Sequence, residues 1–500
     1  MTPRQLLEQL AALGVTPTGV ADDSRQLQAG DVFLAYPGAL ADGRRYIADA
    51  VARGACAVLW QAGGDFVWDP AWTVPNLMVE NLRALAGPLA HAVYQHPSEA
   101  LSLIAITGTN GKTTISQCLA RVYPKPCAVI GTLGAGFPGA LVDTGFTTPE
   151  ASVLMRYLAQ FRDLQAAACA LEASSIGIEE GRLNGARVDV AVFTNLTRDH
   201  LDYHGDMAAY AAAKEKLFGW PRLRTAVINL DDAFGLQLLR RTSAMRVIGY
   251  SLAAPRRDHP ALVRAENLSA TPYGQRFDLL LPTGRVSVDT TLAGEYNVSN
   301  LLACAAVLLD AGLDAREIGQ RLSALTPPAG RMEHVGGVGE PLVVVDYAHT
   351  PDALENALRA LRPLSRARGG KLSVVFGCGG NRDPGKRPQM GAIAAAGADA
   401  LRVTSDNPRG EVAEEIIAAI VRGVPESARS QLICETDRAQ AIARAVAEAA
   451  PEDVILLAGK GHETYQEIAG ERLPFSDRAQ AEQALAERGM RRAALQEKGS

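Results

Sequence analysis

A glycine-rich turn between an apolar strand and a helix constrains the fold of this chain more than any other feature. Residues 101–107 form the continuous apolar stretch of a buried strand, and residues 113–122 follow a helical pattern. The turn between them, TGTNGKTT, occupies residues 107–114. A strand, a glycine-rich loop and a helix in this order are typical of phosphate-binding loops in parallel α/β sheets. We therefore predict an α/β protein built on such a sheet.

The residue types of this loop suit the phosphates of ATP or GTP. The glycines let backbone N–H groups turn toward phosphate oxygens at the positive end of the helix. Lys112 would neutralise phosphate charge, and Thr113 would ligate Mg²⁺. The general spacing G-x-x-x-x-G-K-S/T needs a glycine where Ile106 stands, so the loop is a variant, and an ordinary glycine-rich turn remains an alternative. The predicted ATP contacts in the loop are Gly108, Thr109, Asn110, Gly111, Lys112, Thr113 and Thr114.

Composition excludes several classes of partner. The 50 Lys and Arg against 55 Asp and Glu give a net charge of −5, so no basic excess exists to hold nucleic acid. The seven cysteines are scattered without a C-x-x-C pair, which argues against a disulfide framework and against structural zinc. No apolar run approaches the ~18 residues of a membrane span. We expect a cytoplasmic protein without a membrane span, and a monomer.

The sequence pattern divides the chain into residues 1–97, 98–328 and 329–500. At ~150 residues per domain, a chain of 500 residues also suggests three domains. In the middle part, apolar runs alternate with helical stretches, as a parallel sheet requires. Residues 262–292 then change to a period of two, which predicts appended antiparallel strands. A Pro-Pro pair just before residue 329 ends a helix and marks the second boundary.

The third part restarts the alternation of strand and helix, which is the pattern of a Rossmann-like domain. Its turn at 376–383 has the glycines of a dinucleotide loop, but Arg382 stands where the third glycine is needed, so we do not expect NAD. The predicted strands of this part are 342–346, 372–377, 401–404, 432–434 and 454–458.

Several polar positions in the middle part are candidates for metal chemistry. Glu172 ends a buried apolar strand, where a lone carboxylate needs a cation, although a helix cap is an alternative. His200 and His204 are four positions apart and could share a helix face, but no third soft ligand is nearby to complete a zinc site. Lys214 lies in a helical stretch, where a solvated lysine is the ordinary expectation.

Three segments in order resemble the Mur ligase superfamily. They are the TGTNGKTT loop, TNLTRDHLD at 194–202 and YAAAKEKLF at 210–218. Members of this superfamily, which includes the folylpolyglutamate synthases, are ATP-dependent ligases that join a carboxylate to an amine through an acyl phosphate. The resemblance spans roughly residues 20 to 480, so the same fold and chemistry are implied for this chain.

The resemblance assigns roles that the residues alone leave open. It implies that Lys214 is carboxylated by CO₂, and that the resulting carbamate acts as a metal ligand on a long arm. The implied catalytic residues are Lys112, Glu172, His200 and Lys214. The implied Mg²⁺ ligands are Thr113, Glu172, His200 and the carbamate on Lys214. Further ATP contacts are implied at Asn297, Arg331 and Asp346.

The first part resembles the uridine-nucleotide domain of one branch of this superfamily. The segments that carry the resemblance are DSR at 23–25, GDVF at 30–33 and DGRRYI at 42–47. It implies that Ser24 and the loop at 39–41 meet the uridine diphosphate of UDP-N-acetylmuramoyl-L-alanyl-D-glutamate (UDP-MurNAc-L-Ala-D-Glu). The implied contacts to this substrate are Ser24, Thr147, Thr148, Ser174, Glu180 and Arg182. Ile176 and Glu180 depart from the His and the amide that are common at these positions.

Motifs in the third part resemble those of members that add meso-diaminopimelate. They are DNPR at 406–409, GKGHE at 459–463 and NRDPGKR at 381–387. Meso-diaminopimelate is lysine with one further carboxylate, to which the Arg409 guanidinium offers a bidentate partner. Taken alone, DNPR could be a turn with a surface arginine. The implied contacts to the amino acid are Arg382, Asp406, Asn407, Pro408, Arg409, Gly459 and Glu463.

These features together predict a three-domain α/β ligase. A uridine-nucleotide domain (1–97), a P-loop parallel-sheet ATPase domain with appended antiparallel strands (98–328) and a Rossmann-like amino-acid-binding domain (329–500) would join meso-diaminopimelate to UDP-MurNAc-L-Ala-D-Glu. ATP and Mg²⁺ would be the cofactors. The same ligation with L-lysine, a folylpolyglutamate synthase, a P-loop ATPase of a different class and an inactive binding protein remain alternatives.

Overall fold

The computed structural model describes residues 1–38, 41–253 and 263–499, and it falls into two compact units. Unit 1 comprises Met1–Val263 with Leu302–Leu313, and unit 2 comprises Arg264–Leu301 with Asp314–Ser500. Two residues of the loop expected to meet uridine diphosphate, 39 and 40, lie outside the described residues. Among the helices of the described part, none is long and apolar enough to cross a membrane.

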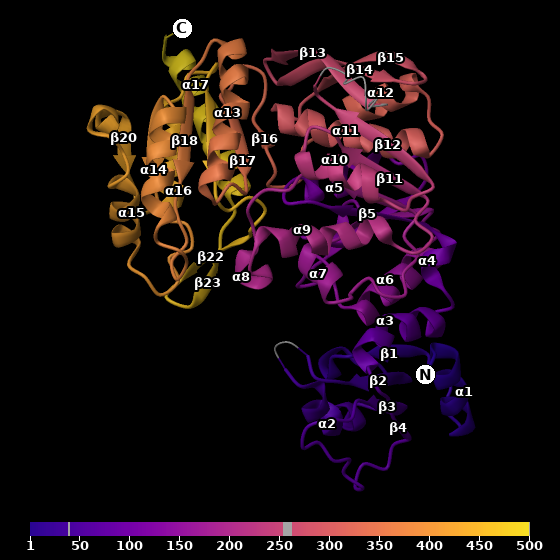
Figure 1. Cartoon of the computed structure of the whole chain (residues 1–500). Coiled ribbons are helices and arrows are strands. Elements are labelled where there is room, and N and C mark those ends of the chain that lie inside the picture. The colour runs from indigo at the N-terminus through magenta and orange to yellow at the C-terminus, as the bar shows by residue number, and fades with distance from the viewer. Residues whose placement is uncertain (39–40, 254–262, 500) are drawn as a thin grey trace. The chain divides into compact units, whose positions relative to one another are not determined.

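Unit 1 begins with a small parallel sheet in the order β1-β2-β3-β4 (Figure 1). Its strands are β1 (Gly19–Ala21), β2 (Asp31–Ala35), β3 (Ala57–Trp60) and β4 (Asn76–Met78). Its helices are α1 (Pro3–Ala12), α2 (Ile47–Ala52), α3 (Leu82–Val93) and α4 (Pro97–Ala100), with 3-10 turns η1 (Ser24–Gln26) and η2 (Gly43–Tyr46).

The larger sheet of unit 1 has the strand order β12-β11-β10-β5-β9-β6-β7-β8, in which the strands from β12 to β6 are parallel and β7 and β8 are antiparallel. The strands are β5 (Ser102–Thr107), β6 (Cys127–Gly131), β7 (Gly134–Phe137), β8 (Ala140–Val142), β9 (Ala168–Glu172), β10 (Val190–Phe193), β11 (Thr225–Asn229) and β12 (Arg246–Ser251). The helices are α5 (Lys112–Val122), α6 (Ala151–Asp163), α7 (Ser175–Glu179), α8 (Leu201–His204), α9 (Met207–Glu215), η3 (Lys216–Gly219) and α10 (Ala233–Arg241).

One hydrophobic core runs through both sheets of unit 1. Leu34 of β2, Leu82 of α3 and Leu103 of β5 belong to the same buried cluster, and α3 packs against α6. Burial of apolar side chains is the main stabilising contribution to such a cluster. The sequence change near residue 97 therefore marks a change of sheet and does not interrupt the core.

Unit 2 contains the expected antiparallel strands and a second parallel sheet. The antiparallel strands are β13 (Val263–Thr271), β14 (Gly274–Leu281) and β15 (Gly284–Thr290), with helix α12 (Ala315–Ser323) against β15. Helix α11 (Glu295–Asp310) passes from unit 2 into unit 1 along the chain. The parallel sheet has the order β16-β17-β21-β18-β19-β20, and only β16 is antiparallel to its neighbour.

The elements of this second sheet follow the predicted alternation. The strands are β16 (Glu333–Val335), β17 (Leu342–Asp346), β18 (Leu372–Phe376), β19 (Ala400–Val403), β20 (Leu432–Cys434) and β21 (Val454–Ala458). The helices are α13 (Pro351–Arg368), α14 (Lys386–Gly397), α15 (Ala413–Val421), η4 (Glu426–Gln431), α16 (Arg438–Glu448) and α17 (Asp477–Gly499). A hairpin of β22 (Tyr465–Ile468) and β23 (Glu471–Pro474) precedes α17.

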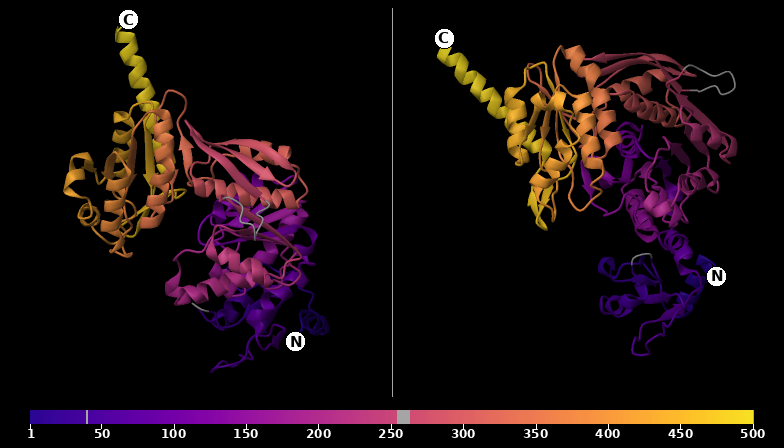
Figure 2. Two further views of the ribbon diagram at one scale, coloured as in Figure 1. Left: turned by 45° about the horizontal axis from the view of Figure 1, so that its top comes forward. Right: turned by 60° about the vertical axis from the view of Figure 1, so that its left-hand side comes forward.

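Helices cover both faces of this sheet (Figures 1 and 2). Val344 and Leu456 belong to a core with α13, α14 and α15. Their chain neighbours Val343 and Leu457 belong to a second core with α16 and α17. Because successive strand residues point to opposite faces, a strand buried on both sides reads as an unbroken apolar run. The expected Rossmann-like alternation is thus observed in this part of the chain.

Candidate active site

The glycine-rich loop of unit 1 follows β5 and leads into α5. Gly108 has a φ of 145°, and a Cβ at this position would come within 1.8 Å of the Thr194 hydroxyl oxygen. The loop is therefore restricted to glycine at this point, both by its conformation and by its neighbour from the end of β10. The Thr194 hydroxyl in turn donates to the carbonyl of Asn110 at 2.6 Å. Loop and neighbouring strand end are fixed together at the carboxyl edge of the sheet.

The side-chain nitrogens of two lysines converge on one carbonyl of this loop. Lys112 Nζ donates to the Gly108 carbonyl at 2.8 Å, and Lys214 Nζ donates to the same oxygen at 3.0 Å. Lys214 reaches it from α9, with its side chain 1% exposed and its Nζ 4.4 Å from the centre of the Tyr210 ring. The ordinary expectation of a solvated lysine is therefore wrong for Lys214. The solvated lysine of this helical stretch is instead Lys216, whose half-exposed side chain pairs with Glu179.

The surroundings of Lys214 disfavour its charged form. Burial, together with the smaller effect of the nearby Lys112 charge, lowers the pKa of Lys214 to about 6, while Asp199 acts in the opposite direction. Desolvation and a like charge both destabilise an ammonium ion. At neutral pH this side chain is accordingly a free amine, which is a nucleophile.

Glu172 is a fully buried carboxylate at the end of β9. Its oxygens accept hydrogen bonds from the Thr113 hydroxyl at 3.0 Å and from the Thr132 amide and hydroxyl at 3.0 and 3.1 Å. The side chain that caps the following helix is Ser174, so the helix-cap alternative for Glu172 is wrong. Hard oxygens from Glu172 and Thr113 at one point are the donor set that Mg²⁺ prefers. The residues present therefore fit this ion.

His200, within the TNLTRDHLD segment, and His204, two positions after its end, have different surroundings. His200 is 44% exposed, adopts a φ of 51°, and its ring centre lies 6.2 Å from that of Tyr210, the ring that also contacts Lys214. His204 forms a 3.0 Å hydrogen bond between Nε2 and the Ser175 hydroxyl. Within the described ranges, neither histidine belongs to a group of three close metal-ligating side chains.

Most of the predicted contacts to the nucleotide-sugar substrate lie beside Glu172. The Thr148 hydroxyl donates to the Glu172 carbonyl at 2.7 Å and lies 3.0 Å from the Ser174 hydroxyl. Arg182 donates to the Thr148 carbonyl at 2.8 Å, and the Thr147 hydroxyl lies 3.1 Å from that of Thr132. These four residues therefore lie near the end of β9 and connect to Glu172 through its backbone carbonyl or through Thr132. Ser24 lies apart from them in η1, where its hydroxyl helps to lower the pKa of Asp49.

The structure accounts for one of the two departures from the family pattern. Glu180 accepts from Arg182 Nε at 2.9 Å and from Nη2 at 2.6 Å, and Arg182 also pairs with Glu150 at 3.1 Å. A carboxylate at position 180 thus orients the guanidinium, which a neutral amide would do with a weaker hydrogen bond. Nothing in the structure explains Ile176.

A second group of polar residues lies at the carboxyl ends of β18, β19 and β21 in unit 2. Asn407 Nδ2 donates to Glu463 at 2.9 Å, and a Cβ on Gly459 would lie 2.6 Å from a carboxylate oxygen of Asp406. Ligands of open parallel sheets bind at such strand ends. Arg382 and Arg409 both border Gly379, at 3.8 and 2.8 Å from a Cβ built there. The predicted amino-acid contacts are therefore neighbours in space.

Lys460 is the residue of this group that the sequence analysis missed. Its side chain is fully buried, and its Nζ contacts Asn407 at 3.0 Å, Glu463 at 3.1 Å and Asp406 at 3.8 Å. A buried ammonium needs such partners. The lysine in GKGHE was visible in the sequence, but only burial distinguishes it from a surface lysine.

Arg409 is held by its backbone and by its guanidinium. It adopts a φ of 53°, and its Nη1 donates to the Gly380 carbonyl at 3.0 Å. Its Nε lies 3.3 Å from the carboxylate of Glu467, a residue that no motif indicated. Non-glycine residues with positive φ are uncommon and are concentrated at functional sites. A plain turn with a solvated arginine does not describe this position.

The predicted ATP contacts outside the loop lie in unit 2. Asn297 is buried; its Nδ2 donates to the Ala293 carbonyl at 2.8 Å, and its Oδ1 accepts from Asn300 Nδ2 at 3.2 Å. The guanidinium of Arg331 lies 4.8 Å from the centre of the Tyr347 ring. Asp346 accepts from the Met332 amide at 2.8 Å, and burial raises its pKa.

A buried ion pair in unit 2 contacts the backbone next to the predicted amino-acid-binding residues. Arg438 and Asp477 are both fully buried and are joined by two hydrogen bonds of 2.7 and 2.6 Å. Arg438 also donates to the carbonyls of Ala458 at 3.0 Å and Ser405 at 3.4 Å. Ala458 is the last residue of β21, directly before Gly459, and Ser405 lies two positions after β19, directly before Asp406. The pair therefore links the two predicted binding segments.

Arg438→Met is expected to lower the free energy of unfolding by ~3–5 kcal/mol, because it leaves the Asp477 carboxylate buried without its partner. Denaturant titration monitored by circular dichroism measures this change. Arg444→Met, on the same helix, removes an exposed pair with Glu435 and should cost ~1 kcal/mol or less. Equal losses in the two variants would show that the buried pair does not have this role.

The chain matches three sequence-family models, which together cover most of its length. They are described as "Mur ligase family, catalytic domain" at residues 16–94, "Mur ligase middle domain" at 106–308, and "Mur ligase, glutamate ligase domain" at 330–461. The two lysines that converge on Gly108 and the buried Glu172 lie in the second match. The polar group at the strand ends of unit 2 lies in the third, apart from Glu463, which is two residues beyond its end.

Curated proteins and solved structures are similar over nearly the whole chain. A UDP-N-acetylmuramoyl-L-alanyl-D-glutamate–2,6-diaminopimelate ligase from Janthinobacterium sp. is 49% identical and covers 97% of each chain. Its namesake from Pseudomonas aeruginosa is 48% identical over 93% of this chain and 94% of its own. A solved ligase of the same name has a TM-score of 0.70, 36% identity and 95% coverage of both chains. A MurF ligase from Thermotoga maritima shares the fold at 18% identity, with a TM-score of 0.61 and coverage of 95% and 97%.

Proposed function

The chain belongs to the Mur ligase family, and from this premise we propose that it adds 2,6-diaminopimelate to UDP-MurNAc-L-Ala-D-Glu at the expense of ATP, a step in peptidoglycan precursor synthesis. The single observation that carries this function is the 49% identity, over 97% of both chains, to a curated ligase of that name. The three-domain α/β architecture predicted from the sequence is that of the family.

The reaction requires one carboxylate to be activated and one amine to attack it. ATP transfers its terminal phosphoryl group to the γ-carboxylate of D-Glu, which gives an acyl phosphate and ADP. The amine of diaminopimelate attacks the acyl carbon, the tetrahedral intermediate loses phosphate, and an amide remains. Positioning and charge stabilisation supply most of the catalysis in such phosphoryl transfers.

In unit 1, the glycine-rich loop and the group around Glu172 would carry the ATP chemistry. Lys112 is placed to neutralise the charge that shifts between phosphates, since its ammonium already lies against the loop carbonyls of Gly108 and Thr109. Glu172 and Thr113 would hold Mg²⁺, with His200 as a predicted further ligand. When bound, Mg²⁺ supplies positive charge against the phosphate oxygens.

Lys214 would work as a carbamate formed with CO₂. A free amine attacks CO₂ whereas an ammonium does not, and the pKa of about 6 leaves this amine free at neutral pH. Carboxylation also gives Lys214 a negative charge, which the ammonium of Lys112 at the same Gly108 carbonyl would attract. These two features support the carbamate and distinguish Lys214 from the exposed Lys216.

Carbamate formation at Lys214 is expected to follow a pH profile near neutrality. An exposed lysine with a pKa of ~10.4 is protonated at pH 8, whereas Lys214 loses its proton as the pH rises through about 6. With ¹³C-labelled bicarbonate, NMR should detect one carbamate at pH 8 that disappears as the pH falls below 6. Lys216→Met should keep the signal and Lys214→Met should lose it. A signal that persists in Lys214→Met would place the carbamate elsewhere.

The amino acid would bind at the strand ends of unit 2. We propose that Arg409 pairs with the distal carboxylate of the meso isomer, with Arg382 beside it and with Asp406, Asn407, Gly459 and Glu463 around the amino-acid group. The contact between Arg409 and Glu467 supports this assignment, because it orients the guanidinium before a ligand arrives.

The predicted contacts to UDP-MurNAc-L-Ala-D-Glu remain proposals with the same basis. Thr147, Thr148, Ser174 and Arg182 surround the end of β9, and Ser24 is proposed for the uridine end. We propose a cytoplasmic location for two reasons. The substrate that the enzyme extends is nucleotide-linked, and all seven cysteines are free thiols in the structure. Phosphate release from ATP that requires both the UDP-linked dipeptide and diaminopimelate, with formation of the UDP-linked tripeptide by mass spectrometry, tests the proposed function.

A further inference from the structure

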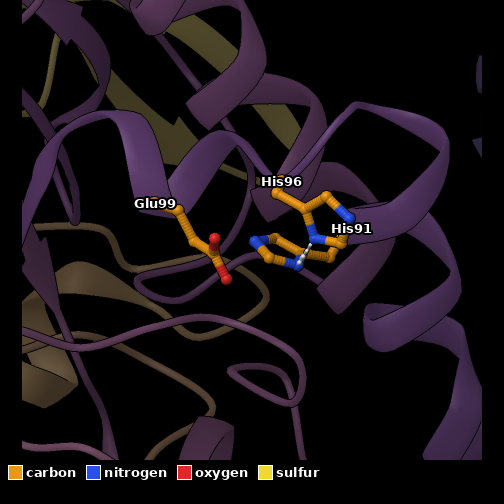
Figure 3. Close-up of side chains that lie close together, drawn as sticks. All are labelled: His91, His96 and Glu99. Carbon is orange, nitrogen blue, oxygen red and sulfur yellow. Dashed lines mark hydrogen bonds between the residues drawn. The ribbon is translucent and has the colours of Figure 1, made fainter.

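Two histidines and a glutamate of unit 1, outside the proposed reaction, lie together between α3 and α4. His91 is in the last turn of α3, His96 precedes α4 and Glu99 lies within it (Figure 3). One nitrogen of each imidazole and one carboxylate oxygen lie within 4.8 Å of one another. The two Nδ1 atoms are 3.1 Å apart. No residue of this cluster has a role in the proposed ligation.

Apart from the contact with His96 Nδ1, the hydrogen bonds of His91 leave its Nδ1 available as a ligand. Its Nε2 lies 2.8 Å from the Ser98 hydroxyl, and that oxygen accepts from the Arg187 amide at 2.9 Å. If Nε2 carries the proton and donates to Ser98, the lone pair is on Nδ1, on the side of His96. A partner for the second ring nitrogen is the usual arrangement of a metal-bound histidine.

The backbone between the two helices places His96 against His91. Gln95 and His96 have φ values of 57° and 55°, so two successive side-chain-bearing residues adopt the left-handed conformation. The His96 amide donates to the His91 carbonyl at 2.7 Å, and Arg162 fixes the Tyr94 carbonyl at 2.7 Å. This conformation is uncommon outside glycine and is concentrated at functional sites. It brings the second imidazole into position without the regular geometry of a helix.

We propose that His91, His96 and Glu99 form a site for Zn²⁺. Two nitrogens bound to one tetrahedral zinc at ~2.0–2.1 Å are about 3.3 Å apart, close to the separation of the two Nδ1 atoms. Imidazole nitrogen and carboxylate oxygen are both common zinc ligands, and water would complete four-coordination. His96 and Glu99 are exposed while His91 is buried, so the ion can enter from solvent. The site would tie the end of α3 to α4, the link between the two sheets of unit 1.

Zinc titration of the full chain against a chromogenic chelator tests this site. The metal-depleted protein is expected to take up one Zn²⁺ per chain in competition with the chelator. His96→Ala and Glu99→Gln each remove an exposed ligand and should weaken this binding by at least the ~10–100-fold that loss of an outer partner costs. Glu355→Gln, an exposed glutamate of α13, is the matched control and should bind zinc as the parent does.

Thermal unfolding supplies a second readout. Zinc should raise the unfolding temperature of the parent and of Glu355→Gln, because a ligand that binds only the folded state stabilises it. His96→Ala should fold without zinc and show no such shift. Equal affinity and equal shifts in the ligand variants and the parent, or no zinc uptake by the parent, would overturn the site. His91 and His96 would then be a hydrogen-bonded imidazole pair. Neither outcome bears on ligation, whose residues are different.

Discussion

Lys214→Ala is expected to reduce the rate of ligation by at least ~10²–10³-fold, the cost of removing one group that stabilises the charge of a transition state. The amine of Lys214 lies against the same loop carbonyl as Lys112, and its pKa of about 6 makes it reactive toward CO₂ at neutral pH. Alanine has no amine that can form a carbamate, so the proposed carboxylate-like metal ligand is absent in this variant. Steady-state release of phosphate in the presence of both substrates measures the effect.

Two comparisons separate this role from a structural one. Lys216→Ala, two positions away and half exposed, should retain the parent rate. Added formate or acetate should partly restore Lys214→Ala, because a small carboxylate can occupy the place of the carbamate, and it should not affect the parent. Full activity of Lys214→Ala, or no difference between the two variants, would remove Lys214 from the site.

Loss of folding would not explain an inactive Lys214 variant. The pKa of Lys214 is about 6 in the folded chain and ~10.4 in an unfolded one, so the unfolded state binds the additional proton between these values. The contribution of this lysine therefore disfavours folding at pH 7, and stability should rise as the pH increases from 6 toward 10. Replacement of Lys214 by an apolar residue removes this pH dependence and should leave the free energy of unfolding at pH 7 no lower.

Arg409→Met is expected to lower kcat/KM for meso-diaminopimelate by ~100-fold or more. The guanidinium would form a bidentate, charge-assisted pair with the distal carboxylate, and a desolvated charge without its partner costs ~3–5 kcal/mol. L-Lysine lacks this carboxylate, so its use should change little and the preference between the two amino acids should collapse. Competition assays with both amino acids measure that preference directly.

Arg409→Lys distinguishes the geometry of the guanidinium from its charge. A lysine ammonium retains the charge but not the planar fork, so it should recover only part of the lost activity. Arg429→Met, an exposed arginine of η4 paired with Glu426, is the control and should behave as the parent. If Arg409→Met retains the preference for diaminopimelate, another residue binds the distal carboxylate. Arg382, which also borders Gly379, is the next candidate.

Much of the fold could be predicted from the sequence because its strands are buried on both faces. The predicted strands at 342–346 and 454–458 have the bounds of the buried strands β17 and β21. Such strands read as apolar runs between helical patterns, and no long-range information is needed to find them. The shared core of the two sheets of unit 1 could not be predicted, since α3 and α6 meet through tertiary packing that no local pattern indicates.

The site could be predicted in part for a different reason. The glycine-rich loop is a local motif, so its residues were identifiable from the sequence alone. Lys214 and Lys460 look like surface lysines in the sequence, and only the structure reveals that both are buried. The resemblance to a family identified Lys214, whereas Lys460 was missed. The pairing of Arg438 with Asp477, 39 positions apart, likewise depends on the packing of α16 against α17.

The most direct measurement is phosphate release with ATP, Mg²⁺ and UDP-MurNAc-L-Ala-D-Glu in three parallel reactions, with meso-diaminopimelate, with L-lysine and with no amino acid. The account predicts release that depends strongly on meso-diaminopimelate and matches the UDP-linked tripeptide formed, one phosphate for each amide. Equal release with L-lysine would contradict the role of Arg409 in specificity. Equal release without any amino acid would contradict ligation itself and indicate an ATPase of a different class.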